Sequence, residues 1–350
     1  MRLIRALIRG SGPFERVELP FAEEDGRARL LTVVHGGGGT GKTTLVQALA
    51  TTRPGHAIAQ LGRSDTGGAG PALVACEWLL GADDPTRPHS LSVASPNVRL
   101  HVDEAVEALR RREQVHYDRV AQEGGFVFLA IPSTRWFSRQ PIMLSAPARG
   151  VARYDVRAPL SLDDASRADL ARETKQALAY AAIAVALAGV RDREERRYDL
   201  LAEAMRGAVD RLADLAGYRY LGLEPHSLEP VFAESSGQRR SFDALPTRAR
   251  HLVAFAALSV RVLWAAYPEQ DPRDSEGVIA IDDIELYQDN AALARVGSAL
   301  REALPAAQWI LTTSSPVLAA SAAASEVLAL RRLSQGDAVA VFAGDDAVIH

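Results

Sequence analysis

Cysteine and lysine are both scarce in this chain of 350 residues. The single cysteine, Cys76, excludes an internal disulfide and any metal site that needs several cysteine ligands. Lysine occurs only as Lys42 and Lys175, and every other strongly basic side chain is an arginine. A lysine that falls inside a functional motif is therefore less easily a coincidence here than in an average sequence.

Neither a strong net charge nor a membrane-length apolar run is present. Lys and Arg number 40 against 44 Asp and Glu, which gives a formal net charge of −4. Nucleic acid is therefore a candidate partner that the net charge does not support. The most apolar run, residues 177–190, is shorter than the ~20 residues that span a bilayer. Residues 1–9 are interrupted by arginines and lack a signal-peptide centre, so we expect a cytoplasmic protein that binds no membrane.

A strand, a glycine-rich loop and a helix are predicted one after another near the N-terminus. Residues 30–34 form an apolar, β-branched run, and residues 45–50 have the composition of a helix. Between them, the glycines and the Gly-Lys-Thr sequence have the spacing of a phosphate-binding P-loop. The predicted nucleotide-binding residues are Gly36, Gly37, Gly38, Gly39, Thr40, Gly41, Lys42, Thr43 and Thr44.

Each residue type of this loop has a chemical role in binding a nucleotide. Glycines let backbone N–H groups approach phosphate oxygens closely, and the helix that follows directs its positive N-terminal end at the same anion. Lys42 is predicted to contact the β- and γ-phosphates and assist catalysis, while the Thr43 hydroxyl is predicted to bind Mg²⁺. The alternative, a turn that binds nothing, is disfavoured by the scarcity of lysine.

A second candidate segment lies late in the chain. Residues 277–281 are apolar and precede two aspartates, as in a buried Walker B strand whose carboxyl end lies beside the P-loop. Asp282 is the predicted Mg²⁺ ligand, and Asp283 is the predicted catalytic carboxylate that orients and deprotonates water. The alternative is a buried strand that ends in a turn with two acidic caps.

The two motifs divide the chain into a predicted α/β core and an insert. The core is expected at residues 1–60 and 240–350, and the insert at residues 61–239. The insert is predicted to hold β segments and a helical hairpin at about 163–216. Strands are expected at 2–9, 14–21, 56–61 and 126–131, and helices at 101–123, 163–188, 194–215, 246–266 and 290–304.

Two local patterns within the insert carry specific expectations. In the helix at 101–123, the apolar positions of the amphipathic pattern include Val102, Val106, Leu109 and Val120. The helix at 163–188 is expected to be capped by Asp163 or Asp164.

A polar loop follows the predicted buried strand at 126–131. Its arginines, Arg135 and Arg139, are candidates for sensing phosphate or a partner, since loops that leave buried strands often line binding clefts. The alternative is that both arginines are solvated while Trp136 packs into the core.

The order of these motifs resembles that of ABC-type ATPases of the RecF/OLD-like group of P-loop NTPases. This group carries an N-terminal strand pair before the P-loop and, late in the chain, an Asp-Glu strand, a helix and a Thr-Thr-His-Ser-Pro segment. The corresponding late segments here are residues 281–286 and 312–316. The resemblance covers residues 1–50 and about 240–320. It implies an ABC-ATPase-like α/β fold with a mixed central sheet, an antiparallel N-terminal β element and a helical insert.

The chain departs from the pattern of this group at several functional positions. The catalytic glutamate position holds Asp283, and the switch histidine position holds Ser314. The Leu-Ser-x-Gly signature is replaced by residues 245–248, or by residues 235–238, which have the right letters but are less well placed.

Other motifs of the group have only candidates here. Gln60 and Gln140 are candidates for the Q-loop glutamine. Arg248 or Arg250 is a candidate arginine finger, with surface solvation as the alternative.

The resemblance implies ATP and Mg²⁺ as cofactors and a head-to-tail homodimer, in which the signature of one subunit covers the nucleotide of the other. Because catalytic positions are altered, we expect a slow Mg²⁺-dependent ATPase or an ATP-gated dimerisation switch, acting with a separate partner protein in DNA maintenance or antiviral defence. The alternative is a non-hydrolysing ATP-binding scaffold. A GTPase is disfavoured because residues 174–177 lack the aspartate of a guanine-specific motif, and a small-molecule kinase would need an acceptor pocket that the sequence does not identify.

Overall fold

The computed structural model covers the whole chain and describes most of it. The described residues are 1–52, 73–79, 89–95, 102–123, 126–139, 142, 166–191, 196–333 and 338–347. The strand predicted at 56–61 and the candidates Gln60 and Gln140 lie outside these residues.

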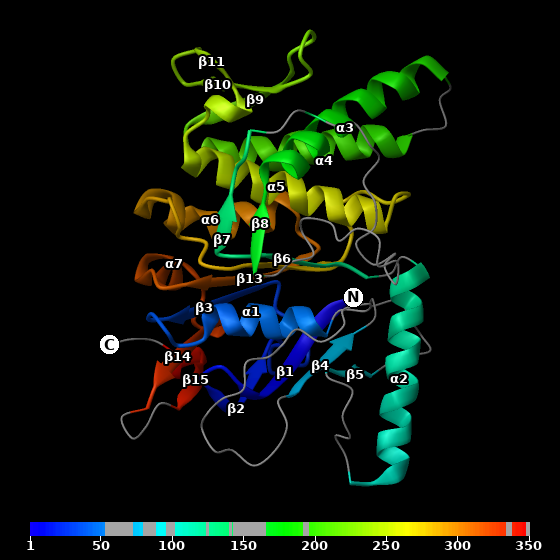
Figure 1. The fold of residues 1–350 in the computed structure, drawn as a ribbon, viewed down its shortest axis with the longest axis vertical. Coiled ribbons are helices and arrows are strands. Elements are labelled where there is room, and N and C mark those ends of the chain that lie inside the picture. The colour runs from blue at the N-terminus through cyan, green and yellow to red at the C-terminus, as the bar shows by residue number, and fades with distance from the viewer. Residues whose placement is uncertain are drawn as a thin grey trace.

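A six-stranded mixed sheet forms the centre of the protein (Figure 1). Its order is β15-β14-β3-β13-β12-β6, in which only the β14–β15 pair is antiparallel. Its strands are β3 (Leu31–Gly36), β6 (Phe128–Ile131), β12 (Gly277–Ile281), β13 (Ala307–Thr313), β14 (Val327–Arg332) and β15 (Val339–Ala343). Every residue of β12 and β13 is buried, and β12 is continuously apolar, as expected of a parallel strand that is covered on both faces.

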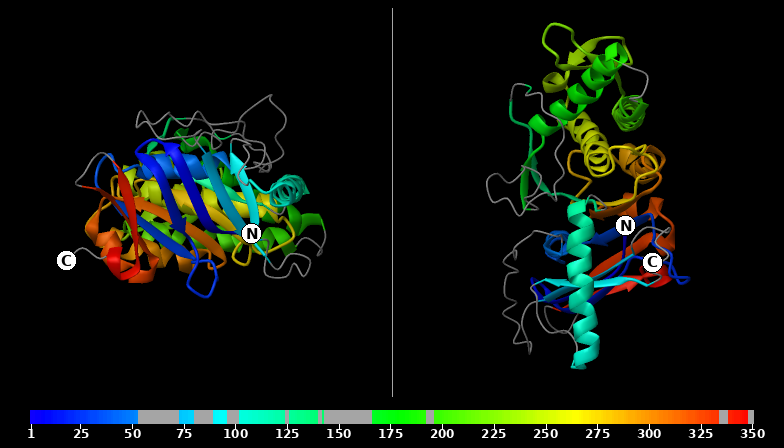
Figure 2. Two further views of the ribbon diagram at one scale, coloured as in Figure 1. Left: turned by 90° about the horizontal axis from the view of Figure 1, so that it is seen from below. Right: turned by 90° about the vertical axis from the view of Figure 1, so that its right-hand side faces the viewer.

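A four-stranded antiparallel sheet lies below the central sheet and faces the viewer in Figure 2, left. Its order is β2-β1-β4-β5, and its strands are β1 (Arg2–Ser11), β2 (Phe14–Pro20), β4 (Leu73–Leu79) and β5 (Leu91–Ser95). Helix α1 (Lys42–Thr51) contacts strands of both sheets. Ile8, Leu45, Leu49 and Ile310 are fully buried in the apolar cluster between the sheets.

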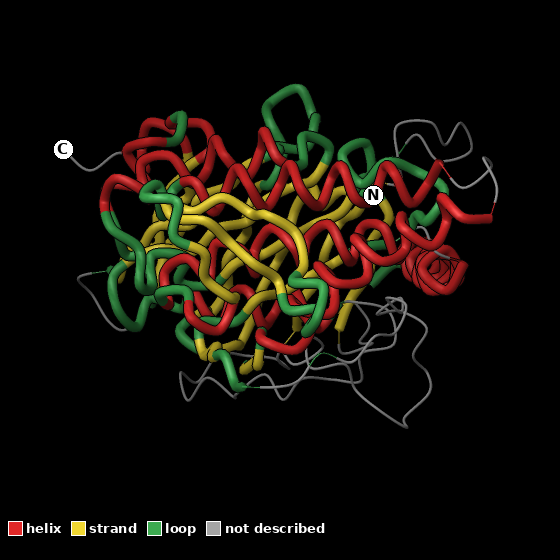
Figure 3. The backbone as a smooth tube through the Cα atoms, turned by 90° about the horizontal axis from the view of Figure 1, so that it is seen from above, coloured by secondary structure: helices red, strands yellow, loops and turns green. Residues whose placement is uncertain are grey.

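Helices cover the opposite face of the central sheet, as the view from above shows (Figure 3). They are α5 (Thr247–Ala266), α6 (Asn290–Ala303) and α7 (Pro316–Ser321), with α3 (Ala171–Arg191) and α4 (Arg196–Asp214) packed outside α5. Within the described residues, α5 is the one helix long and apolar enough to cross a membrane, and 89% of that stretch is buried inside the protein. Here α5 is the central core helix, in contact with α3, α4 and β6.

Smaller β elements complete the fold. A three-stranded sheet of β9 (Tyr218–Leu223), β10 (Pro230–Glu234) and β11 (Arg239–Ser241) lies at the top of Figure 1, and β7 (Thr134–Trp136) pairs in parallel with β8 (Arg167–Asp169). Short 3-10 helices are η1 (Phe242–Ala244), η2 (Ala324–Glu326) and η3 (Gly344–Ala347). Strands β4, β5 and β6 come from the range 61–239, so this range contributes to both larger sheets.

Helix α2 (Glu104–Glu123) has the reverse of its predicted polarity. Val102 just before it, and Val106 and Leu109 within it, are exposed, while its buried face carries acidic and basic side chains. On this face, Glu113 and Gln114 serve β5, an edge strand whose backbone N–H groups need partners. Side chains of α2 accept from two of these groups, at Ser92 and Ala94. The side chain of Val120 lies outside the described part.

Helix α3 begins eight residues later than predicted, at Ala171 rather than Asp163. The residues just before it form β8, which pairs with β7. The Asp169 carboxylate caps the helix by accepting from the Ala171 backbone N–H at 3.1 Å. The predicted caps Asp163 and Asp164 lie outside the described residues.

Candidate nucleotide-binding site

The glycine loop leads from β3 directly into α1. Gly41 has φ +94°, and a Cβ atom there would lie 2.6 Å from Pro13 Cγ and 2.7 Å from Phe14 Cζ. At Gly36, a Cβ atom would lie 2.5 Å from Thr40 Oγ1. Glycine is therefore required at these two positions, by backbone conformation at the first and by close approach at both.

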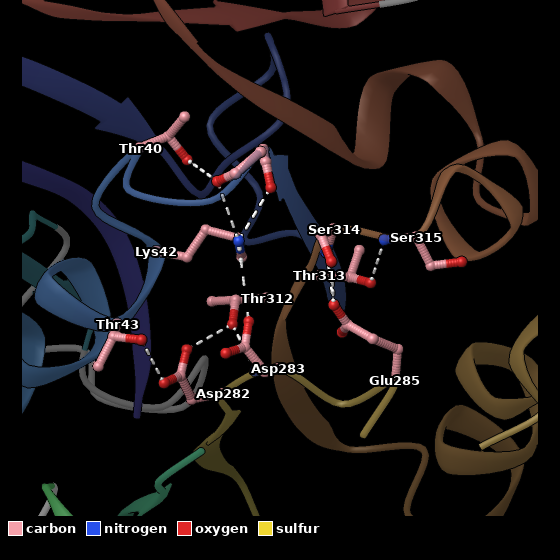
Figure 4. Close-up of polar contacts among 12 residues, drawn as sticks. Thr40, Lys42, Thr43, Asp282, Asp283, Glu285, Thr312, Thr313, Ser314 and Ser315 are labelled. Carbon is pink, nitrogen blue, oxygen red and sulfur yellow. Dashed lines mark hydrogen bonds and ion pairs between the residues drawn. The ribbon is translucent and has the colours of Figure 1, made fainter. Parts of the chain in front are cut away.

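Lys42 extends back across the loop that precedes it (Figure 4). Its ammonium donates to the carbonyl oxygens of Gly36 at 2.9 Å and Gly37 at 3.2 Å, and lies 3.8 Å from Asp283 Oδ1. Thr40 Oγ1 also donates to the Gly37 carbonyl, at 2.9 Å. The one cation within the P-loop thus lies between the loop and the carboxylate predicted to be catalytic.

A chain of hydrogen bonds joins the P-loop to the strands that come late in the sequence. Thr43 Oγ1 donates to Asp282 Oδ2 at 2.7 Å, and Thr312 Oγ1 donates to Asp282 Oδ1 at 2.6 Å. Asp282 is almost fully buried, at 1% exposure. The arrangement follows from the sheet, because parallel β3, β13 and β12 are neighbours and end at the same edge.

The side-chain oxygen atoms of Thr43 and Asp282 fit the predicted magnesium site. Mg²⁺ prefers oxygen ligands and usually keeps water and phosphate oxygens in its shell. Thr43 and Asp282 provide a hydroxyl and a carboxylate side by side. Among the described residues, no group of three or more His, Cys, Asp or Glu side chains could hold a metal by itself, so the remaining ligands would come from phosphate and water.

Asp283 has an uncommon backbone conformation for a residue other than glycine, with φ +43°. Its backbone N–H donates to Thr312 Oγ1 at 2.8 Å. Burial, and then the negative charge of Asp282, raises the pKa of the half-buried Asp283 carboxyl. The predicted catalytic carboxylate therefore lies in a held, partly desolvated turn next to Lys42. We call residues 282–285 the acidic turn.

The last residue of the acidic turn, Glu285, was not singled out by sequence reasoning. Its Oε1 atom accepts from both the backbone N–H of Ser314, at 2.7 Å, and the Ser314 hydroxyl, at 2.6 Å (Figure 4). Burial raises the pKa of Glu285, but the hydrogen bonds from Ser314 outweigh it and the pKa is lowered overall. The only feature of the sequence that pointed to Glu285 was an acidic residue three positions after Asp282.

Arg135 is buried, at 7% exposure, and Trp136 is 46% exposed. The alternative of a solvated Arg135 beside a core Trp136 is therefore wrong. Side chains alternate along β7, which turns Arg135 inward. Its guanidinium donates to main-chain carbonyls, including those of Asp282 and Asp283. Burial lowers the pKa of Arg135 to about 10, which leaves it charged at neutral pH. Arg139 is exposed.

The two candidate signature segments have different surroundings. Residues 245–248 lead into α5, whereas residues 235–238 form the turn between β10 and β11. Arg248 donates to Asp289 Oδ2 at 2.5 Å and to the Leu215 carbonyl. This candidate arginine finger is therefore engaged within its own subunit.

Three further side chains lie around the loop or the candidate signature. Arg250 lies over the Phe137 ring, 5.1 Å from its centre. Thr44 packs against Gly12, in the turn between β1 and β2. Arg332 of β14 donates to the Gly39 carbonyl at 3.2 Å, a contact that the sequence did not indicate.

Comparison with known proteins identifies a fold. No model of a known protein family matches the chain, and no curated protein matches it. An SmcHead bound to the C-winged helix domain of ScpA matches with a TM-score of 0.54 and 13% identity, over 98% of this chain and 97% of that one. An Smc head domain with an extended coiled coil, bound to the C-terminal domain of ScpA derived from Pyrococcus furiosus, matches with a TM-score of 0.52 and 16% identity, over 97% and 96%.

These matches include residues 61–239, which the sequence resemblance left uncovered. At this level of identity the likeness is one of fold, and it does not distinguish the RecF/OLD-like group. The predicted fold class, α/β with a mixed central sheet and an antiparallel N-terminal β element, is confirmed. The chain has the fold of SMC head domains.

Proposed function

We propose that this protein binds ATP with Mg²⁺ and works as a slow ATPase or as an ATP-gated dimerisation switch. The observation that carries the proposal is the 2.7 Å hydrogen bond between Thr43 and Asp282, which are 239 positions apart in the sequence. A hydroxyl of the P-loop and a buried carboxylate have little reason to meet unless both serve one ligand.

The proposed roles follow from the chemistry of each side chain. Lys42 holds the β- and γ-phosphates, and the P-loop N–H groups bind the same oxygens. Thr43 and Asp282 hold Mg²⁺, which when bound offsets phosphate charge. Asp283 orients the attacking water and accepts its proton.

Slow turnover is expected from the residues that flank the γ-phosphate position. The position of the switch histidine carries Ser314, whose hydroxyl donates to the Glu285 carboxylate. That pair brings negative charge where ATPases of the RecF/OLD-like group have the switch histidine. General acid–base help is typically worth ~10²–10⁴-fold, so a weaker constellation slows hydrolysis by a large factor.

The second candidate function is a scaffold that binds ATP without hydrolysing it. The same Ser314–Glu285 pair favours it, because neither group stabilises charge that develops on a leaving phosphate. In both readings ATP supports a head-to-tail homodimer that presents a surface to a separate partner protein. SMC heads bound to ScpA domains offer a precedent for the partner, and the RecF/OLD-like resemblance suggests DNA maintenance or antiviral defence as the setting.

Calorimetry and turnover assays test the proposal on three proteins. The wild-type chain should bind ATP more tightly with Mg²⁺ than without it, and Lys42→Ala should lose most of this affinity. Asp283→Asn is the matched catalytic variant, because asparagine tolerates the same left-handed backbone. It should bind ATP normally, abolish any hydrolysis and accumulate an ATP-dependent dimer in sedimentation experiments.

Each outcome has a definite meaning. Absence of ATP binding by the wild type would refute the proposal. Turnover unchanged in Asp283→Asn would show that Asp283 is not the catalytic carboxylate. ATP-dependent dimerisation with no turnover in the wild type would select the scaffold over the ATPase.

A further inference from the structure

Arg135 is a buried cation that the proposed nucleotide chemistry does not use. It belongs to β7, outside both the P-loop and the acidic turn. Its guanidinium lies over the ring of Phe255 in α5, 5.2 Å from the ring centre. Burial of a charge is costly, so the contacts that offset the cost indicate what the side chain does.

These contacts are main-chain carbonyl groups on two segments. One terminal nitrogen, Nη1, donates to the carbonyl oxygens of Pro132 at 2.9 Å and Asp282 at 2.5 Å. The other, Nη2, donates to the carbonyl oxygen of Asp283 at 2.9 Å. The planar guanidinium thus holds two successive carbonyls of the acidic turn at once, which a lysine ammonium cannot do in the same geometry.

The acidic turn needs such support. A left-handed conformation is unfavourable for a residue with a side chain, and it persists only where the surroundings hold it. Asp283 has φ +43°, and its N–H is held by Thr312 on one side. Arg135 holds its carbonyl on the other side. The direction of both acidic side chains follows from this doubly anchored backbone.

We propose that Arg135 is a positioning residue that fixes the acidic turn, so that Asp282 and Asp283 point at the phosphate end of the site. The inference rests on the proposed function. Arg135 acts through the backbone, in contrast to the phosphate contact that the sequence suggested. It contributes from a strand in the middle of the chain, so the predicted insert participates in the site.

The test compares Arg135→Ala and Arg135→Lys with Arg139→Ala, a matched control in which an exposed arginine four residues later is removed. Calorimetry gives the ATP affinity with and without Mg²⁺, and a phosphate-release assay gives turnover. In Arg135→Ala we expect Mg²⁺-free ATP affinity within about twofold of wild type, loss of the gain in affinity that Mg²⁺ brings, and turnover lower by on the order of 10²-fold. Arg139→Ala should match the wild type.

Arg135→Lys keeps the charge and covers the case in which the alanine variant does not fold. It should lose part of the Mg²⁺-dependent gain, since an ammonium cannot hold both carbonyls. Guanidinium chloride at a non-denaturing concentration should restore part of the loss in Arg135→Ala, an effect that general destabilisation would not produce.

The inference and the proposed function fail in different ways. If the wild type shows no ATP binding, the proposed function fails and the inference with it. If the wild type binds ATP in a Mg²⁺-dependent way and both Arg135 variants keep that dependence and the turnover within about twofold, only the inference is refuted. An equal loss in Arg139→Ala would also refute it.

Discussion

A pH dependence of stability is expected from His251, which lies one turn into α5 beside the acidic turn. The ring is 1% exposed. Its Nδ1 lies 2.8 Å from the Thr247 carbonyl, which can only accept, so Nδ1 carries the proton of the neutral ring. The ring stacks on Tyr287 at 5.0 Å and meets Phe137 edge-on at 4.9 Å. Burial, and then the charge of Arg135, lowers the pKa of His251 to about 4.

The size of the effect follows from linkage between protonation and folding. In the unfolded chain the pKa of a histidine is about 6.5. Between about pH 6.5 and pH 4 the unfolded state therefore binds more protons, so the contribution of His251 is complete above this window and is lost as pH falls through it. A difference of ~2.5 pKa units corresponds to about 3 kcal/mol in total, of which about 2 kcal/mol is lost between pH 7 and pH 5.

Urea unfolding at pH 7 and pH 5 measures this contribution. His251→Phe keeps an aromatic ring and removes the titration, so the wild type should lose about 2 kcal/mol more stability on acidification than the variant does. His226→Ala, at an exposed position, is the control and should follow the wild type. Equal losses in the wild type and His251→Phe would refute the reasoning and show that the ring can accept a proton in the folded protein.

Three further predictions concern other contacts. Gly41→Ala should lower the free energy of unfolding by about 2–3 kcal/mol in urea titrations because of its positive φ and close neighbours, whereas Gly37→Ala, with open space around it, should change it by less than about 0.5 kcal/mol. Thr312→Val should weaken Mg²⁺-dependent ATP binding about tenfold by calorimetry, because it removes the donor to Asp282, while Thr312→Ser should keep it. Lys175→Met should cost about 2–3 kcal/mol of unfolding free energy because the buried ammonium pairs with two carboxylates, and an unchanged urea midpoint would contradict this.

The sequence predicted those parts of the site that depend on strand order along one sheet edge. The P-loop lies at the end of β3 and Asp282 at the end of β12, and parallel strands of one sheet bring their carboxyl ends together. The order of apolar runs and polar ends was therefore sufficient to predict that Thr43 and Asp282 would be neighbours. The helices at 194–215 and 290–304 were confirmed within two residues at each end for a different reason, which is that their patterns are long and periodic.

Side chains that compensate one another across the fold were beyond prediction. Arg135 and Trp136 are adjacent on β7, so their side chains lie on opposite faces of the strand. Which of them is buried depends on which face the fold turns toward the interior. On α2, Glu113 is buried where it accepts from the backbone of the edge strand β5, a demand that arises from the pairing of that strand. The Glu285–Ser314 pair joins a turn to the end of another strand, and neither partner is informative alone.

Those unpredicted contacts connect the site to the middle of the chain. Arg135 reaches the acidic turn from β7, and β8, which pairs with β7, leads directly into α3. On α3, Lys175 holds Asp243 at 2.6 Å, in the short η1 helix that precedes the candidate signature segment. Both halves of the proposed site, the carboxylates and the candidate signature segment, are thus tied to one unit made of β7, its partner strand β8 and helix α3. Because packed protein interiors do not deform continuously, a partner that shifts α3 must either move both ends of this unit or be resisted by both. A partner bound to α3 should therefore change Mg²⁺-dependent ATP affinity and ATP-dependent dimerisation together, and a partner that changed only one of them would show that the two ends are uncoupled.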